Sequence, residues 1–147
     1  MINVRIKKVR ESAKIPEYAT EGSAAVDLRY AGDEIIKLAP GERKLVPTGI
    51  AIAPETTGVV ALLCARSGLA SKKGLTLSNC VGVIDSDYRG EISAAMINLG
   101  NEEVALEPGE RIAQLMFVPV LTANFIEVGE LDETTRGAGG FGSTGTK

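Results

Sequence analysis

The sequence predicts an all-β protein, and three observations support this fold class. The chain has 147 residues, which is the length of about one domain. Its apolar residues fall in short runs rich in Val, Ile and Ala, and turn signals containing Gly and Pro separate these runs. Aromatic residues make up only 4% of the composition, so small and branched side chains must fill the interior. Many short strands with regular turns are typical of a β-sandwich or β-barrel.

Short strands are expected in order along the chain. They lie at residues 2–9, 34–38, 43–47, 49–53, 58–64, 91–97, 111–120 and 124–128. Another apolar strand is expected around Asp27, and an apolar run before Asp85 predicts one arm of a β-hairpin. A short helix is expected at residues 67–73, where good helix formers follow Ser67, a residue suited to an N-cap.

A turn sequence is repeated within this pattern. Leu-x-Pro-Gly-Glu-Arg occurs at residues 38–43 and again at residues 106–111. Proline at the second turn position and glycine at the third favour a type II turn that opens the following strand. Reuse of a good turn and an ancient duplication of a sheet element both explain the repeat.

The character of the chain changes after Val128. Residues 129–147 contain one leucine and one phenylalanine, which is too little apolar surface to offset the entropy lost on ordering. The sequence therefore predicts one β domain at residues 1–128 and a flexible, Gly-rich C-terminal arm at residues 129–147. Such an arm is either a plain linker or a lid that orders over a bound ligand.

Composition and charge exclude several classes of function. The formal net charge of −3 speaks against a nucleic-acid polymer as partner, since such binders neutralise many phosphates with a basic face. The chain has no histidine, so a general base must be a carboxylate, thiolate, lysine or tyrosine. No apolar run suits a membrane span and no secretion signal is evident, so we expect a cytoplasmic protein with reduced Cys64 and Cys80.

The segment at residues 65–75 contains groups that suit an anion. Arg66 offers a guanidinium, Ser67 offers a hydroxyl group, and backbone N–H groups are accessible beside Gly68. The same residues also suit the cap of a short surface helix. Taken alone, the segment leaves both interpretations open.

The segment at residues 79–92 places polar side chains around a turn. Asp85 ends an apolar run, and Asn79 and Tyr88 lie on either side of it. An ordinary hairpin tip uses the same residue types. However, an amide carries a donor and an acceptor that suit the edge of a base, and a phenol ring can pack against a sugar.

Two further strands carry isolated polar residues. Strand alternation places Asp27 on the face opposite Val26 and Leu28, where either a solvated side chain or a carboxylate facing a hydrated divalent metal is possible. Arg111 and Gln114 lie on opposite faces if their strand is regular. Arg111 suits a structural ion pair, and Gln114 can orient a phosphate or a water.

The arm offers groups that complement these segments. Arg136 suits a terminal phosphate, Ser143 and Thr144 offer hydroxyl groups, and Phe141 can stack on a base. Glycine on either side of them lets the backbone lie close to an anion.

In this order, five segments resemble the motifs of the homotrimeric dUTPase family. They are AAVDLRYA (24–31), ARSGLASKKGL (65–75), GVIDSDYRGEI (82–92), GERIAQL (109–115) and RGAGGFGSTG (136–145). One departure is Ala65, where the second motif commonly has proline, and this change affects local rigidity more than chemistry. The resemblance implies a trimer of jelly-roll-like β subunits that hydrolyses dUTP to dUMP and pyrophosphate with Mg²⁺. It also implies active sites shared between subunits, with the C-terminal arm reaching a neighbour's site.

The resemblance further implies a role for each matching residue. Asp85 would orient and deprotonate the attacking water, and Asp27 would face magnesium through waters. The other matching residues would bind substrate: Asn79 and Gly82 at uracil, Tyr88 at the deoxyribose, Arg66, Ser67, Gly68 and Gln114 at the phosphates, and Arg136, Gly142, Ser143 and Thr144 as a clamp beneath Phe141.

Two other functions are also compatible with these residues. A dCTP deaminase shares the fold, although the third segment is of the dUTPase type. A nucleotide-binding regulator that holds dUTP, or that signals to a partner through the arm, belongs to a different class.

Overall fold

The computed structural model describes residues 1–140 of the chain. Phe141, Gly142, Ser143 and Thr144, which are predicted to clamp the ligand, lie outside the described residues. Within the described range the chain forms eleven strands and one helix. They are β1 (Val4–Lys8), β2 (Val26–Arg29), β3 (Ile36–Leu38), β4 (Arg43–Pro47), β5 (Ile50–Pro54), β6 (Val59–Ala65), α1 (Ser67–Lys73), β7 (Leu75–Leu77), β8 (Val81–Ile84), β9 (Ser93–Asn98), β10 (Val104–Leu106) and β11 (Arg111–Pro119).

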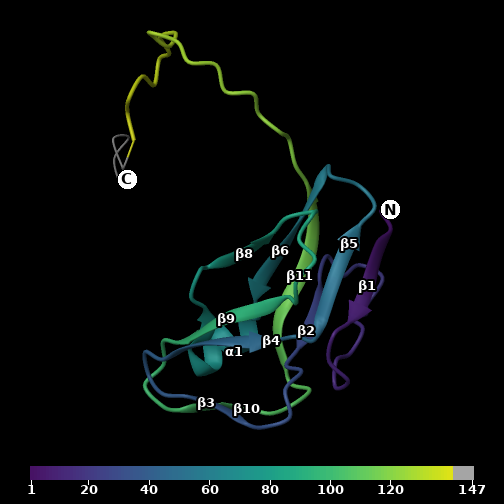
Figure 1. Ribbon diagram of the computed structural model, residues 1–147. Coiled ribbons are helices and arrows are strands. Elements are labelled where there is room, and N and C mark those ends of the chain that lie inside the picture. The colour runs from purple at the N-terminus through teal and green to yellow at the C-terminus, as the bar shows by residue number, and fades with distance from the viewer. Residues whose placement is uncertain (141–147) are drawn as a thin grey trace.

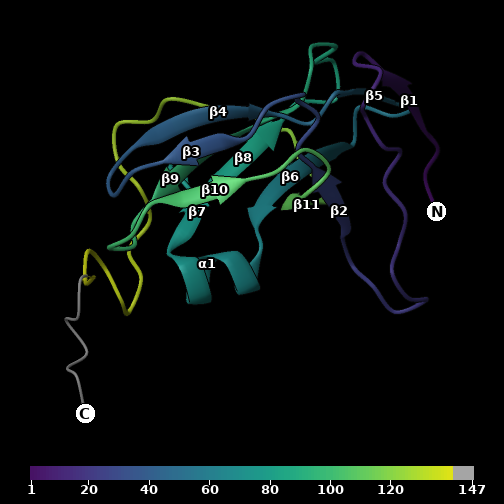
Figure 2. The ribbon, with the colours of Figure 1, turned by 90° about the horizontal axis from the view of Figure 1, so that it is seen from below.

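The strands form two main sheets and two smaller pairs. The larger sheet has the order β2-β11-β6-β8, and the second has the order β4-β9-β7. β1 pairs with β5 and β3 pairs with β10, and every pair is antiparallel. The sheets are not closed into a barrel, and together they form a jelly-roll-like sandwich (Figures 1 and 2). The predicted all-β fold class is therefore confirmed.

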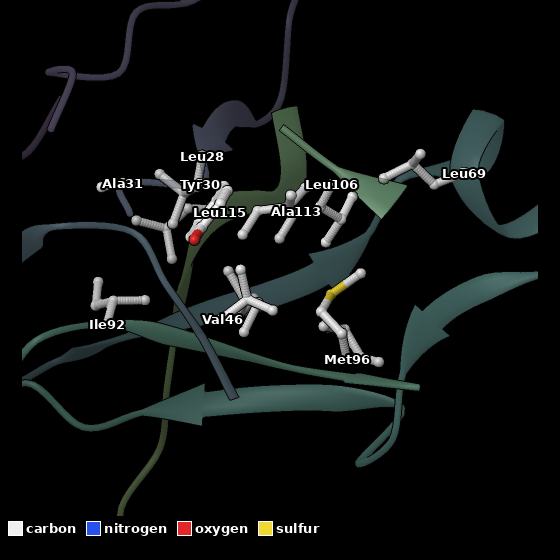
Figure 3. Packing of buried hydrophobic residues seen from close by; sticks show 14 of the residues in the cluster. Leu28, Tyr30, Ala31, Val46, Leu69, Ile92, Met96, Leu106, Ala113 and Leu115 are labelled. Atoms are coloured by element: carbon white, nitrogen blue, oxygen red, sulfur yellow. The ribbon is translucent and has the colours of Figure 1, made fainter. Parts of the chain in front are cut away.

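The hydrophobic core lies between the two main sheets (Figure 3). Leu28 from β2 and Leu115 from β11 face Val46 from β4 and Met96 from β9, and each is at most 2% exposed. Each such side chain contributes roughly 1.5–3 kcal/mol through burial. Aliphatic side chains fill most of this core, as the aromatic-poor composition predicts.

One buried polar side chain connects the core to a turn. Asn98, at the end of β9, is 0% exposed. Its Nδ2 donates to the carbonyl oxygens of Leu38 and Glu102 at 2.9 and 2.8 Å, and its Oδ1 accepts from the N–H of Gly100 at 2.9 Å. Because its hydrogen-bonding groups are satisfied, this amide can stay in the core and fix the turn after β9.

The repeated turn sequence adopts the predicted conformation twice. Gly41 and Gly109 have φ values of 79° and 83°, in the left-handed region that glycine favours. In each turn the glutamate after the glycine closes the turn, since the N–H groups of Glu42 and Glu110 donate to residues three positions earlier at 2.9 and 3.0 Å. These turns lead into β4 and β11, so the predicted strand openings are confirmed.

The helix is found where the sequence predicts it, but its N-cap differs. Arg66, not Ser67, occupies the cap position, with an extended backbone and no side-chain capping bond. Ser67 is instead the first helical residue, and its carbonyl oxygen accepts from Ser71 Oγ at 2.6 Å. The helix ends at Gly74, whose φ is 68°. No helix in residues 1–140 has the length and apolar character that a membrane crossing needs.

The strand expected at residues 124–128 is absent, and this prediction was wrong. Phe125 is 94% exposed and Ile126 is 76% exposed, and the segment after β11 runs away from the strands (Figure 1). The branched residues give this segment a strand-like pattern, but a strand needs a partner edge, and no described strand pairs with it. By contrast, β7 and β10 were not expected, because three residues are too few to show a period.

Candidate active site

Four of the predicted site residues line one pocket of about 290 Å³, called the hairpin pocket because these residues come from positions 79–92, around the hairpin that the sequence predicts. Asn79, Gly82, Asp85 and Tyr88 all contribute to it, and apolar side chains that include Leu63 complete the lining. The pocket therefore combines a carboxylate, an amide and a phenol against an apolar wall. This combination suits a base and sugar that need both packing and hydrogen bonds.

The pairing of β8 with β6 delivers Asp85 to this pocket. Gly82 lies opposite Leu63 in the register, and a Cβ at position 82 would lie 3.0 Å from Leu63 Cβ, so a glycine gives the closest packing. β8 does not pair with β9, the next strand along the chain, so the β-hairpin predicted around Asp85 is not formed as a pair of consecutive strands. β8 ends at Ile84, and Asp85 follows as an exposed residue at the start of a turn. The N–H of Tyr88 closes this turn by donating to the carbonyl oxygen of Asp85 at 3.1 Å.

The ring of Tyr88 is held by its neighbours in the chain. Its hydroxyl group donates to the carbonyl oxygen of Glu91 at 3.1 Å. A Cβ at Gly90 would lie only 2.3 Å from that hydroxyl oxygen, so the ring covers a position that glycine alone leaves open. Arg89 Nη1 donates to the carbonyl oxygens of Ser86 and Tyr88 at 2.7 and 3.0 Å and braces the same turn. The ring is thus presented to the pocket in a defined orientation.

Asn79 enters the pocket from a strained connection between β7 and β8. Cys80 has a φ of 63°, the one positive value among the non-glycine residues that the structure describes. The N–H of Val81 donates to the carbonyl oxygen of Asn79 at 2.7 Å, which tightens this bend. Positive φ at a side-chain-bearing residue costs energy and is concentrated at functional sites. Cys64 and Cys80 are both free, so no disulfide holds the bend.

A second group of predicted residues surrounds Asp27 on β2. Arg66 Nε donates to Asp27 Oδ1 at 2.8 Å, and Arg111 Nη1 donates to Asp27 Oδ2 at 3.0 Å. Arg66 also donates to the carbonyl oxygen of Arg111 at 3.3 Å. The Asp27 side chain is only 18% exposed, so it is not the freely solvated group that one interpretation of the sequence allowed. The ion pair predicted for Arg111 is present.

A β-bulge changes the predicted faces of β11. The register with β2 shifts between Arg111 and Ala113, and Ile112 and Ala113 are both fully buried. The bulge resets the alternation, so Gln114 lies opposite Asp27 while Arg111 still reaches the same carboxylate. The strand is therefore not regular at this point, and Arg111 and Gln114 do not take the opposite faces that a regular strand would give them. An extra residue in a strand re-aims side chains in this way.

The remaining phosphate-site candidates lie at the start of α1. Ser67 and Gly68 are both exposed, and a Cβ at Gly68 would meet nothing within 4 Å. Packing within the chain therefore does not require a glycine here, whereas Gly82 and Gly90 both have close neighbours. An open backbone next to Arg66 leaves room for an incoming anion.

The donor groups around Asp27 fit magnesium only through water. Both carboxylate oxygens already accept from arginines, and no group of three or more potential metal-ligating side chains occurs within residues 1–140. Each carboxylate oxygen keeps a further lone pair that can accept from a metal-bound water. Magnesium retains several waters and commonly binds with the phosphates of its substrate, so an outer-sphere contact is compatible with this site.

The two groups of residues line different cavities in the single chain. Asp85, Asn79 and Tyr88 line the first pocket, whereas Asp27 and Gln114 line another of about 410 Å³ beside Cys64. Arg136 donates to the carbonyl oxygen of Gly139 at 2.9 Å, in the segment that runs away from the strands. One described chain therefore does not bring all the predicted site residues together.

Two residues that are not among the predicted site residues form an ion pair that involves the pocket lining. Glu91 lines the pocket with Asp85, and Arg10 pairs with it at 2.6 Å across 81 positions of sequence. Glu91 comes directly after the Tyr-Arg-Gly sequence, and this position could have indicated a place in the site. Nothing in a single sequence identifies Arg10 as its partner.

Comparisons with known proteins identify a family for this chain. The dUTPase family model matches residues 11–145. A deoxyuridine 5′-triphosphate nucleotidohydrolase of Desulfitobacterium hafniense is 53% identical over 98% of this chain and 97% of its own length. The nucleotidohydrolase of Hahella chejuensis is 48% identical over 100% of this chain and 97% of its own length.

Solved structures show the same likeness in three dimensions. The dUTPase of Staphylococcus bacteriophage 80alpha with dUpNHpp has a TM-score of 0.88 and 29% identity, covering 97% of this chain and 98% of that one. A mutant dUTPase from phage phi11 of S. aureus, described for its structural Mg(II) ion, has a TM-score of 0.80. It covers 89% of this chain and 99% of that one, and its 24% identity supports the fold alone.

The curated relatives are nucleotidohydrolases, and the solved relatives share the jelly-roll-like β scaffold of this chain, which is therefore an enzyme of the nucleotide-hydrolysing class. Within this class of enzymes, the dUTPase family model matches nearly the whole chain. The chain belongs to the dUTPase family.

Proposed function

We propose that this chain hydrolyses dUTP to dUMP and pyrophosphate, with Asp85 as the general base. One observation carries the proposal: Asp85, Asn79 and Tyr88 line a single pocket, as base, amide and phenol. Family membership and a relative solved with dUpNHpp, an analogue of dUTP, support the choice of substrate. The product dUMP serves dTMP synthesis, and removal of dUTP limits uracil incorporation into DNA. A cytoplasmic location stays a prediction.

Different groups in the hairpin pocket bind the base and the sugar of the nucleoside. The amide of Asn79 and backbone groups near Gly82 pair with the edge of uracil, because that edge presents both donors and acceptors. The ring of Tyr88 packs against the deoxyribose and leaves no room for a 2′ hydroxyl group. Cytosine would cover polar groups of this pocket and leave them unpaired, which discriminates strongly.

In the reaction, Asp85 accepts a proton from a water aimed at the α-phosphorus. The bond from the water oxygen to that phosphorus forms while the bond to the bridging α,β-oxygen breaks, and pyrophosphate leaves. Attack at a phosphate depends more on alignment and charge neutralisation than on a strong base, so a carboxylate serves where histidine is absent.

The groups around Asp27 hold the phosphates. Arg66, Ser67, Gly68 and Gln114 contact the phosphate chain, and Asp27 keeps the Arg66 guanidinium in place through the bond at 2.8 Å. When bound, magnesium supplies charge neutralisation at the phosphates, and Asp27 contacts its waters. Arg136, Gly142, Ser143 and Thr144 close over the substrate with Phe141 stacked on the base.

A homotrimer unites the two groups of residues. The hairpin pocket of one subunit faces the phosphate-binding residues of a second, and the arm of the third covers the substrate. Support for this assembly comes from the separate cavities within one chain and from the exposed apolar residues after β11.

Phosphorus NMR of the reaction in ¹⁸O-labelled water tests the proposal. We expect dUTP to be consumed in the presence of magnesium and the label to appear in dUMP. Label in pyrophosphate would place the attack on the β-phosphorus and refute the mechanism. Release of ammonia from dCTP would instead identify a deaminase, and binding of dUTP without turnover would identify a regulator.

A further inference from the structure

An ion pair joins Arg10, which lies outside the predicted motifs, to Glu91 in the third motif, and it anchors the segment that carries Asp85 and Tyr88. Arg10 Nε donates to Glu91 Oε1 at 2.6 Å, and Arg10 Nη2 donates to Glu91 Oε2 at 3.0 Å. Glu91 Oε1 also accepts from the N–H of Gly49 at 2.8 Å. A two-pronged contact between a guanidinium and a carboxylate fixes orientation as well as distance. The Glu91 side chain is 23% exposed, so this contact is partly shielded from water.

The backbone at Gly49, which donates to Glu91, requires a glycine. Its φ is 71°, and a Cβ there would lie 2.6 Å from Ala13 Cβ and 2.8 Å from Ala31 Cβ. The backbone at position 49 can therefore approach the N-terminal segment that carries Arg10 only because the residue is glycine. The approach places the N–H of Gly49 against the carboxylate of Glu91.

The backbone of this segment is also hydrogen-bonded on the other side of Glu91. The hydroxyl group of Thr48 donates to the carbonyl oxygen of Ile92 at 2.6 Å, and the N–H of Ile92 donates to Ile50 at 2.8 Å. Thr48 and Ile92 are each 2% exposed. Glu91 is therefore held through its side chain and through the residue that follows it.

This anchoring acts on the ring of Tyr88 through one atom. The carbonyl oxygen of Glu91 accepts the Tyr88 hydroxyl group at 3.1 Å. Asp85, by contrast, follows directly on β8 and is positioned by the pairing of β8 with β6, where Ile84 lies opposite Ala61. A disturbance at Glu91 therefore reaches the tyrosine ring more directly than it reaches the carboxylate of Asp85.

We propose that Arg10 and Glu91 are positioning residues that fix the Tyr88 ring and thereby set the discrimination between deoxyribose and ribose. The inference rests on the proposed function, in which Tyr88 packs against the sugar of dUTP. Glu91→Gln keeps an oxygen for the Gly49 N–H but replaces the second oxygen with a donor, which cannot accept from Arg10. Arg10→Lys keeps the charge but loses the fork that holds both oxygens.

The test compares kcat and KM for dUTP and UTP in the wild-type enzyme, Glu91→Gln and Arg10→Lys. We expect both variants to lower the ratio of kcat/KM for dUTP over UTP about tenfold, which is within the span of a lost packing contact. The KM for dUTP should rise severalfold, with kcat changing less than about threefold, because Asp85 stays in place. Glu103→Gln is the matched control, since it removes an exposed pair with Lys37 at 3.3 Å away from the hairpin pocket.

The possible outcomes separate this inference from the proposed function. Unchanged nucleotide selectivity in both variants, even with a lowered melting temperature, would show a purely structural pair and overturn the inference alone. An equal change in Glu103→Gln would also overturn it. A wild-type enzyme that does not hydrolyse dUTP would overturn the proposed function and this inference together.

Discussion

Asp85 stands at the end of β8 as an exposed carboxylate on the rim of the hairpin pocket. No described hydrogen bond or ion pair engages its side chain, in contrast to the carboxylate of Asp27, which two arginines hold. A carboxylate left unengaged within the described chain is free to accept a proton from water, whereas one that is already paired serves better to orient its partners. The two aspartates therefore suit different roles.

Replacement of Asp85 by asparagine tests the role of this residue. The amide has nearly the same shape but cannot accept the proton, so we expect kcat to fall by roughly 10² to 10⁴ while nucleotide affinity stays within about tenfold. Single-turnover kinetics with a separate binding measurement would check this prediction. A variant with unchanged rate would contradict the assignment of the base.

A second prediction concerns how the stabilisation by the Arg10–Glu91 ion pair depends on pH. The hydrogen bonds from Arg10 lower the pKa of the Glu91 carboxyl, with a smaller contribution from the Gly49 N–H. Because the folded-state pKa is below the unfolded value of about 4.3, the stabilisation is complete above that pH and is lost as pH falls through the lower folded pKa. The difference in melting temperature between wild type and Glu91→Gln should be full at neutral pH and should shrink in acid. A difference that grows on acidification would contradict this account.

At the scale of elements, the two glycines at the ends of α1 differ in whether the fold requires a glycine. Gly74 ends α1 with a φ of 68°, and a Cβ there would lie 2.4 Å from the backbone nitrogen of Gly100. Gly68, in the first turn of the same helix, has open space where a Cβ would lie. The two positions therefore respond differently to the same substitution.

We predict opposite effects from alanine at these two positions. Gly74→Ala should lower the free energy of unfolding by at least about 1–2 kcal/mol, because it combines backbone strain with a clash against the backbone. Gly68→Ala should leave stability unchanged or raise it by up to about 1 kcal/mol through helix propensity, while weakening dUTP binding. Chemical denaturation and binding titrations would measure both effects. Equal destabilisation by the two substitutions would contradict the open backbone at Gly68.

The sequence predicts elements well where the pattern is local. The turns at Gly41 and Gly109, the helix at residues 67–73 and most strands follow from residue types alone. The strand predicted at residues 124–128 was wrong, because pairing depends on a partner edge that residues 1–140 do not supply. The bulge next to Ile112 and the pairing of Arg10 with Glu91 were missed, because both depend on contacts distant in sequence.

At the scale of the whole molecule, the segment after β11 carries large apolar side chains that are exposed to solvent. Leu121, Phe125 and Leu131 are 99%, 94% and 85% exposed along a segment that leaves the strands (Figure 1). Apolar exposure of this extent favours burial against another molecule. A neighbouring copy of the same chain fits the proposed trimer, in which the arm that follows reaches a distant active site.

Complementation between two inactive variants tests the central claim most directly. One variant is Asp85→Asn with an intact arm, and the other keeps Asp85 but lacks residues 136–147. Each alone is expected to lack activity. Equal amounts of the two chains would be unfolded together, refolded and assayed for dUTP hydrolysis, with each variant refolded alone as the control.

If different subunits supply Asp85 and the arm, some sites in the mixed trimers contain both intact parts. In random assembly, half of the sites receive an intact Asp85, and half of those also receive an intact arm from another subunit. About a quarter of the wild-type activity should therefore return. Mixed trimers that form but recover no activity would show that one chain supplies both parts, and would contradict the shared active site.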